Sequence, residues 1–176
     1  MKKNNLILFA VIALLVIVIA VFLKLNKEDL SHRVNLSEEA EIDLFLEESY
    51  LATITYGDII AFEPQEFIAL LKEDGKEASE QTYTGVLLKD LLSSFNIDLN
   101  KVESVVVKAV DGYTVVVENQ KLIEDDNVYL AYKRNGEFLK TREEGGVGPY
   151  QMVISNDPFS QFWCKYVVNI EVREKK

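Results

Sequence analysis

The feature that most constrains this chain is an uninterrupted apolar run near its N-terminus. Residues 6–23 read LILFAVIALLVIVIAVFL and contain no polar side chain. A helix needs about 20 apolar residues to cross a bilayer. The run passes directly into KLNKEDLSHR, without the small-residue cleavage site that follows a secretory signal. We therefore predict a transmembrane signal anchor over residues 6–23, preceded by a cytoplasmic N-terminus over residues 1–5.

The rest of the chain is acidic, and its charge narrows the choice of partners. The whole chain has 19 Lys and Arg, of which Lys2 and Lys3 precede the apolar run. Residues 24–176 therefore carry 17 basic and 29 acidic residues, a net charge of −12. Nucleic-acid binding requires clustered Lys and Arg, so we expect no nucleic-acid partner. Basic residues lie on both sides of the apolar run, and we expect the acidic part outside the cytoplasm. The cell membrane is then a partner through the N-terminal helix.

Composition divides the acidic part into a connector and a domain. Residues 24–48 are rich in Glu and are predicted to form an acidic stalk, whereas a globular pattern begins at Tyr50 and predicts a domain over residues 49–176. The single cysteine, Cys164, excludes an internal disulfide. The domain must therefore be stabilised by a hydrophobic core.

Hydrophobic periodicity predicts mostly strands, with a few helices near the start of the domain. Strands are expected over residues 50–56, 59–63, 102–110, 113–118, 128–134, 137–140, 150–155 and 165–172. Helices are expected over residues 64–74 and 85–95, with a polar loop over 76–84 between them and a turn or short helix over 119–126. Asp111-Gly112 and Asn135-Gly136 indicate hairpin turns. This order favours an α+β fold of mostly antiparallel or mixed strands.

A glycine cluster, Gly145-Gly146-Val147-Gly148-Pro149, is the most informative local motif. Successive glycines can point backbone N–H groups into one concavity that binds an anion. The stretch lacks the Lys-Ser/Thr pair of a P-loop and precedes a strand rather than a helix. On pattern alone, a wide turn between two strands is the favoured interpretation.

Four segments, in order and spacing, resemble the oxidoreductase molybdopterin-binding domain family, whose fold is that of sulfite oxidase. They are YTGVLLKDLLSSFNI (83–97), VVVKAVDGYTVVV (105–117), VYLAYKRNGEFLKTREEGGVGPYQMVI (128–154) and FWCKYVVNIEV (162–172). The match covers most of residues 50–172. The resemblance implies a sulfite-oxidase-like α+β domain, with molybdopterin as the cofactor to be considered.

The chain departs from this family at the metal. In catalytic members a Cys thiolate binds molybdenum from a loop before the first segment, and a soft thiolate suits that metal. The corresponding loop here, residues 72–81, contains no Cys. The Arg that many members place after Gly-Pro is absent, since Tyr150 and Gln151 stand there. Cys164 lies beside Trp163, where a buried structural role is expected. The resemblance therefore indicates a degenerate member with no catalytic residue, no metal site and no bound cofactor.

We expect a non-catalytic domain that binds a small molecule or a partner protein at the glycine loop. The candidate ligand site joins the loop to nearby aromatic and charged side chains, namely Gly145, Gly146, Gly148, Pro149, Tyr150, Asp111, Tyr113, Tyr132, Arg134 and Arg142. The two Arg side chains suit bidentate binding of an anion, or pairing with neighbouring Glu residues. Two alternatives stay open. One is an active molybdopterin oxidoreductase with a carboxylate ligand such as Glu77 or Glu80, and the other is a purely structural or assembly role.

Overall fold

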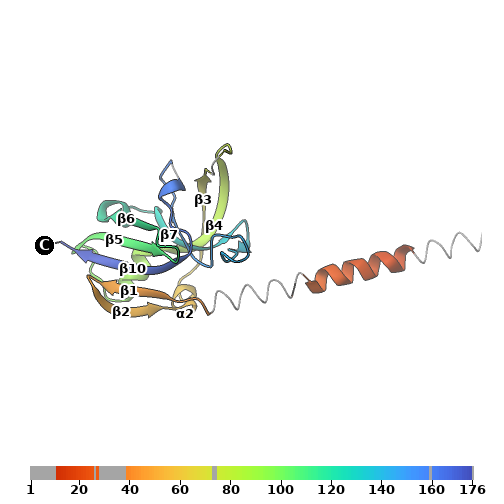
Figure 1. The fold of residues 1–176 in the computed structure, drawn as a ribbon, viewed down its shortest axis with the longest axis horizontal. Helices are drawn as coiled ribbons and strands as arrows, with labels where there is room; N and C mark the ends of the chain where they lie inside the picture. The colour runs from red at the N-terminus through yellow and green to blue at the C-terminus, as the bar shows by residue number, and fades with distance from the viewer. Residues whose placement is uncertain (1–10, 26, 28–38, 73–74, 159, 176) are drawn as a thin grey trace, which may run out of the picture. The chain divides into compact units, whose positions relative to one another are not determined.

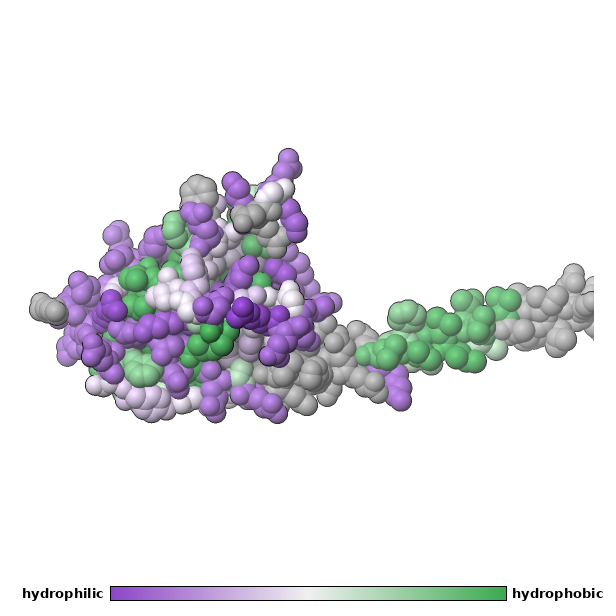
Figure 2. Space-filling model, in the orientation of Figure 1, coloured by the Kyte–Doolittle hydropathy of each residue, from purple (hydrophilic) through white to green (hydrophobic). Residues whose placement is uncertain are grey.

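The chain divides into two units, Met1–Asn35 and Leu36–Lys176. The computed structural model describes residues 11–25, 27, 39–72, 75–158 and 160–175. In the first unit residues 11–25 are helical, and their apolar side chains are exposed on all sides (Figure 2). Among the described residues, no helix has both the length and the apolar character needed to span a bilayer. Residues 1–10, with part of the expected anchor, and residues 28–38 of the expected stalk lie outside the described part.

The second unit contains two five-stranded sheets (Figure 1). The first sheet has the order β2-β1-β10-β5-β6. Its strands are β1 (Ile42–Leu46), β2 (Ser49–Ile54), β5 (Val102–Ala109), β6 (Thr114–Glu118) and β10 (Val167–Glu174). β1 runs parallel to β10, and the other neighbours are antiparallel. The central strand β5 is covered on both faces, since Val106 is buried as well as its neighbours Val105 and Val107. In β10, Ile170 is completely buried.

The second sheet has the order β3-β4-β7-β8, and β9 also pairs with β7. Its strands are β3 (Gln65–Leu71), β4 (Ser79–Leu87), β7 (Val128–Arg134), β8 (Glu137–Phe138) and β9 (Gln151–Ile154). All of its pairs are antiparallel. The β7–β8 turn places Asn135 and Gly136 at φ 54° and 80°, which Asn-Gly tolerates, so the hairpin expected there is confirmed.

Short helices connect the strands. They are α2 (Tyr56–Ile60), α3 (Leu88–Ser94), α4 (Asn119–Ile123) and the 3-10 helix η1 (Ser160–Phe162). Leu88, Leu91 and Leu92 of α3 are buried at helical spacing and contribute to the core. The mixed α+β class, dominated by strands, is confirmed. The β5–β6 hairpin and the short helix expected over 119–126 are confirmed as well.

The predicted helix over residues 64–74 is wrong, because Gln65–Leu71 form β3. Burial along the segment alternates with a period of two: Ala69 is buried, whereas Ile68 and Leu70 point outward. The apolar residues also fit a helical spacing, which misled the prediction. The segment pairs with β4 along its whole length, and this pairing satisfies its backbone N–H and C=O groups. The segment therefore forms a strand.

The predicted strand over residues 59–63 is also wrong, since Tyr56–Ile60 form α2. The missed signal is a capping box. The Thr55 side chain accepts from the Asp58 N–H at 3.4 Å, and the Asp58 carboxylate accepts from the Thr55 N–H at 2.8 Å. These two reciprocal bonds start a helix at Tyr56, the last residue of the strand expected over residues 50–56.

Two further boundaries differ from expectation. The polar loop expected over residues 76–84 forms most of β4, which continues to Leu87, so the helix predicted from residue 85 begins only at Leu88. Ile42–Leu46, expected in the stalk, form β1 between β2 and β10. The alternation of buried Ile42 and Leu44 with exposed Asp43 was the overlooked signal, and the domain begins earlier than residue 49.

Candidate ligand-binding site

The ten predicted ligand residues do not converge on one site. A first pocket, of about 450 Å³, is bordered by three of them, namely Arg134, Gly145 and Gly146. A second, of about 280 Å³, is bordered by three others, namely Arg142, Gly148 and Pro149. A third, of about 520 Å³, is lined by two more, Asp111 and Tyr113. The last two, Tyr132 and Tyr150, are buried, and burial raises the pKa of both phenols above its usual range.

The glycine loop uses its own backbone donors internally. The Gly146 N–H donates to the Thr141 carbonyl at 2.8 Å, and the Gly148 N–H donates to the Lys140 carbonyl at 2.7 Å. The Gly145 N–H is bonded in the same way, to the carbonyl three residues earlier at 3.0 Å. An anion-binding nest needs such N–H groups to point outward together. These three amides are already committed, so the loop is not built as a nest.

Close packing explains why glycine occupies this loop. A Cβ atom added at Gly146 would overlap the Lys140 carbonyl, and one at Gly148 would lie 2.5 Å from the Leu139 Cβ. The loop is also tied to the end of the chain, since the Tyr166 hydroxyl donates to the Gly146 carbonyl at 2.8 Å. Glycine therefore permits close packing within the wide turn between β8 and β9 that the pattern indicated.

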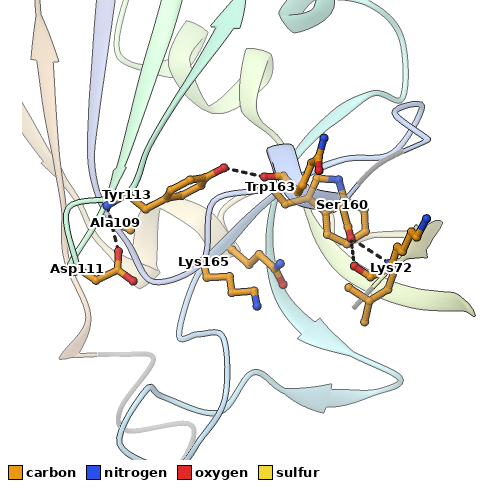
Figure 3. Close-up of a pocket in the computed structure, with 10 residues that line it drawn as sticks. Lys72, Ala109, Asp111, Tyr113, Ser160, Trp163 and Lys165 are labelled. Atoms are coloured by element: carbon orange, nitrogen blue, oxygen red, sulfur yellow. Dashed lines mark hydrogen bonds between the residues drawn. The ribbon is translucent and has the colours of Figure 1, made fainter. Parts of the chain in front are cut away.

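The pocket of about 520 Å³ has a different character (Figure 3). We call it the Trp163 pocket, and its principal lining residues are Lys72, Asp111, Tyr113, Gln151, Trp163 and Lys165. These come from the end of β3, the β5–β6 turn, the start of β9 and the segment after η1. In Figure 3 Lys165 lies centrally, with Asp111 and Tyr113 on one side and Trp163 and Lys72 on the other.

The rim of the Trp163 pocket is held by hydrogen bonds to η1. The Ser160 hydroxyl accepts from the Lys72 N–H at 2.9 Å and donates to the Lys72 carbonyl at 2.8 Å. From the opposite side the Tyr113 hydroxyl donates to the Gln161 carbonyl at 2.6 Å (Figure 3). These bonds connect the end of β3 and the start of β6 to the same short helix, so the two sheets share one rim.

An aromatic stack supports the inner wall. Trp163 is only 3% exposed, and its indole N–H donates to the Ile154 carbonyl at 3.1 Å. The ring packs edge-on against Tyr83 at 5.7 Å, and Tyr83 stacks on Phe67 at the same distance. Since the only polar atom of the indole is already bonded, Trp163 gives the pocket a rigid apolar surface.

The polar groups of the pocket are incompletely satisfied. Gln151 is 1% exposed, and its Oε1 has no hydrogen-bond partner among the described residues. Asp111 accepts from the Tyr113 N–H at 3.1 Å. Within the described part of the chain, Lys72 and Lys165 form no ion pair. The pocket therefore offers one buried acceptor and an excess of positive charge.

Cys164 faces away from this pocket although both of its neighbours line it. Its side chain is completely buried, and its Sγ lies 3.8 Å from the Val107 carbonyl oxygen. Burial, aided by the negative charge of Asp111, raises the pKa of the Cys164 thiol to about 12. The thiol is thus protonated at neutral pH, and the expected structural role is confirmed.

The paired sheets with a pocket at one shared end define the sulfite-oxidase-like class of fold. The crystal structure of the sulfane dehydrogenase SoxCD from Paracoccus pantotrophus shares this fold, with a TM-score of 0.61 and 19% sequence identity, over 79% of this chain and 39% of that chain. The family model described as oxidoreductase molybdopterin binding domain matches residues 47–176, and the chain belongs to that family. No curated protein matches the chain.

The two departures from the family meet at the Trp163 pocket. The loop in which the resemblance implies a thiolate begins at Lys72. Gln151 is one of the two positions after Gly148-Pro149 at which many members place Arg. Both residues line this pocket. Sequence reasoning noted both losses but did not bring them together. It missed Lys165 and Ser160 as site residues, although Lys165 lies within the fourth resembling segment, 162–172.

The residues present do not fit a molybdenum centre. Among the residues that the structure describes, no Cys or His side chain lines the Trp163 pocket, and the chain's one thiol is buried and protonated. Glu77 and Glu80, the carboxylates considered as replacement ligands, do not line it either. In the part of the chain that the structure describes, no group of three His, Cys, Asp or Glu residues is placed to hold a metal ion. No step of metal chemistry can be derived from these side chains.

Proposed function

We propose that this domain is a non-catalytic member of its family that binds a small molecule in the Trp163 pocket. The observation that carries the proposal is the contrast between a well-formed pocket and a missing thiolate. The pocket keeps a rigid aromatic wall and a fixed rim, whereas the only Cys is buried behind it. Binding at this pocket is favoured over the glycine loop, because the loop amides are already bonded.

The pocket residues suit binding rather than bond-making chemistry. Trp163 supplies apolar contact, Gln151 supplies a hydrogen-bond acceptor, and Lys165 supplies a positive charge. General acid–base catalysis needs a group whose pKa lies near the working pH. Among the described residues that line the pocket, Asp111 alone has a carboxylate, and that group accepts a hydrogen bond that fixes the β5–β6 turn. The domain would therefore hold a ligand without transforming it.

Metal analysis tests this proposal. The full chain is purified from a host that makes the molybdenum cofactor, and molybdenum and pterin are measured per chain. We expect neither above the level of a membrane protein purified in parallel, and no change in Cys164→Ala. A stoichiometric amount of molybdenum would refute the proposal, and its disappearance in Cys164→Ala would identify the thiol as a ligand.

We also propose that residues 6–23 anchor the chain in a membrane, with the acidic domain outside the cytoplasm. The support is the absence of polar side chains from this run. Its described part is a helix with apolar side chains on all sides, which favours an apolar environment. Alkaline extraction of membranes tests the anchor: the full chain should remain in the pellet, and a chain lacking residues 1–23 should be released. Release of the full chain would overturn it.

Protease protection tests the orientation in intact cells. A protease added outside should digest the acidic domain while a cytoplasmic marker protein survives. Digestion only after lysis would place the domain in the cytoplasm.

A further inference from the structure

We infer that the Trp163 pocket selects a small organic anion that also donates a hydrogen bond, such as a hydroxy-substituted aromatic carboxylate. This inference rests on the proposed binding function and gives that function a ligand class. Three independent features of the pocket carry it: a buried acceptor, a local charge and an apolar wall.

The buried acceptor calls for a donor in the ligand. Backbone pairing with Ala131 of β7 places Gln151 on β9, and its side chain lines the pocket. Its Oε1 is buried without a partner among the described residues. A buried polar group left unpaired destabilises a fold, so such a group calls for a partner that a ligand can supply. A ligand hydroxyl would supply the missing hydrogen bond.

The local charge calls for an anion. The whole chain has a net charge of −10, yet the charged residues lining this pocket within the described part of the chain are Lys72, Lys165 and Asp111, which together carry +1. Neither Lys is paired within the described residues, whereas the Asp111 carboxylate is engaged by the Tyr113 N–H. An ammonium group near a partly apolar wall binds a carboxylate more strongly than it would in open solvent.

The apolar wall and the size of the pocket call for an organic body. Trp163, Leu71 and Ala109 contribute apolar surface. A pocket of about 520 Å³ has the volume of a typical small-molecule site. An inorganic anion would use the charge and leave the aromatic wall empty. A single ring bearing a carboxylate and a hydroxyl matches all three features.

Matched probes test this ligand class on the full chain in detergent. 4-Hydroxybenzoate carries both groups, benzoate lacks the donor, and 4-hydroxybenzyl alcohol lacks the charge. Calorimetry measures the affinities, and the emission of Trp163, the only Trp in the chain, reports binding beside it. We expect saturable binding of 4-hydroxybenzoate, with both other probes weaker by about tenfold. Equal affinity for the three probes, or no saturable binding, overturns the inference.

Variants then assign each preference to a residue. Lys165→Met should lower the affinity for 4-hydroxybenzoate by about tenfold and leave the affinity for 4-hydroxybenzyl alcohol unchanged. Gln151→Leu should abolish the preference for 4-hydroxybenzoate over benzoate. Lys140→Met, at the glycine loop, is the control and should change neither affinity. If Lys140→Met weakens the probe and Lys165→Met does not, the pocket is misassigned.

The two proposals fail in different ways. Absence of probe binding by molybdenum-free protein overturns the ligand class and leaves the non-catalytic assignment standing. Molybdenum in the purified chain overturns the non-catalytic assignment itself.

Discussion

The glycine loop and the Trp163 pocket make opposite use of their polar groups. In the loop the N–H groups of Gly145, Gly146 and Gly148 are all bonded to nearby carbonyls. In the pocket the buried Gln151 Oε1 has no partner among the described residues, and Lys165 forms no ion pair there. The loop carried the more conspicuous sequence motif, whereas the pocket had none. A binding site is better located by following which donors and acceptors remain unsatisfied than by motif alone.

The largest change in stability is expected from a substitution in the glycine loop. Gly146→Ala should lower the free energy of unfolding by about 3 kcal/mol, because the added Cβ overlaps the Lys140 carbonyl. Urea unfolding measures the change. Gly57→Ala is the control, since its Cβ would only reach ordinary contact with Thr55, and it should change stability by less than about 0.5 kcal/mol. Full stability with lost probe binding in Gly146→Ala would reverse the assignment of the two regions.

The second effect concerns the thiol behind the pocket. The pKa of Cys164 is about 12 in the folded chain, against an ordinary value of 9.0, so the unfolded chain loses the proton first as pH rises. The stabilisation is complete below pH 9.0 and is lost towards pH 12. Between these values the unfolding free energy of the wild type should fall more steeply than that of Cys164→Ala, by up to about 1.4 kcal/mol per pH unit.

Denaturant unfolding at a series of alkaline pH values measures this difference. The shared tyrosines contribute equally to both proteins, so the comparison isolates the thiol. Identical slopes, or rapid reaction of the native thiol with a thiol reagent at neutral pH, would show that Cys164 is accessible and would reopen the question of a metal ligand.

The third effect tests the rim of the pocket. Ser160→Ala removes two hydrogen bonds to the Lys72 backbone and should cost about 1–2 kcal/mol of stability. The substitution should also lower the affinity for 4-hydroxybenzoate, because the end of β3 is then less firmly held. Ser93→Ala is the control, since its hydroxyl bonds only to the Lys89 carbonyl within α3. Equal effects of the two substitutions would mean that the rim is not fixed by Ser160.

The smallest expected effect is a gain in the free energy of unfolding, on replacement of Gln151. Gln151→Leu replaces the unpartnered buried acceptor with an apolar side chain and should raise the free energy of unfolding by about 1 kcal/mol. Thermal or urea unfolding without ligand measures the gain. A loss of stability would show that the Gln151 amide already has a structural partner, and that the pocket is as internally satisfied as the loop.

Regular hairpins were predictable from the sequence, whereas the β3–β4 region was not. Asp111-Gly112 and Asn135-Gly136 fix turns by local backbone geometry, so the strands beside them could be identified. Residues 65–71 fit both a helical and a strand spacing, and only pairing with β4 decides between them. Such tertiary pairing is not encoded within the segment itself.

The candidate site was predictable only in part. The resemblance identified the lost thiolate loop and the substituted position at Gln151, and Asp111 and Tyr113 do line the pocket. The site depends equally on Lys165 and on the hydrogen bonds of Ser160 to Lys72, which lies 88 residues away in sequence. No pattern within one segment reports contacts of that range, so the prediction was centred on the glycine motif.

One titration tests both regions at once. Chemical shifts of ¹⁵N-labelled full chain are followed by nuclear magnetic resonance as 4-hydroxybenzoate is added. We expect the indole N–H of Trp163 and the side-chain amide of Gln151 to shift, while the backbone amides of Gly145, Gly146 and Gly148 stay unchanged. Shifts concentrated at those three glycines, with Trp163 and Gln151 unaffected, would contradict the account.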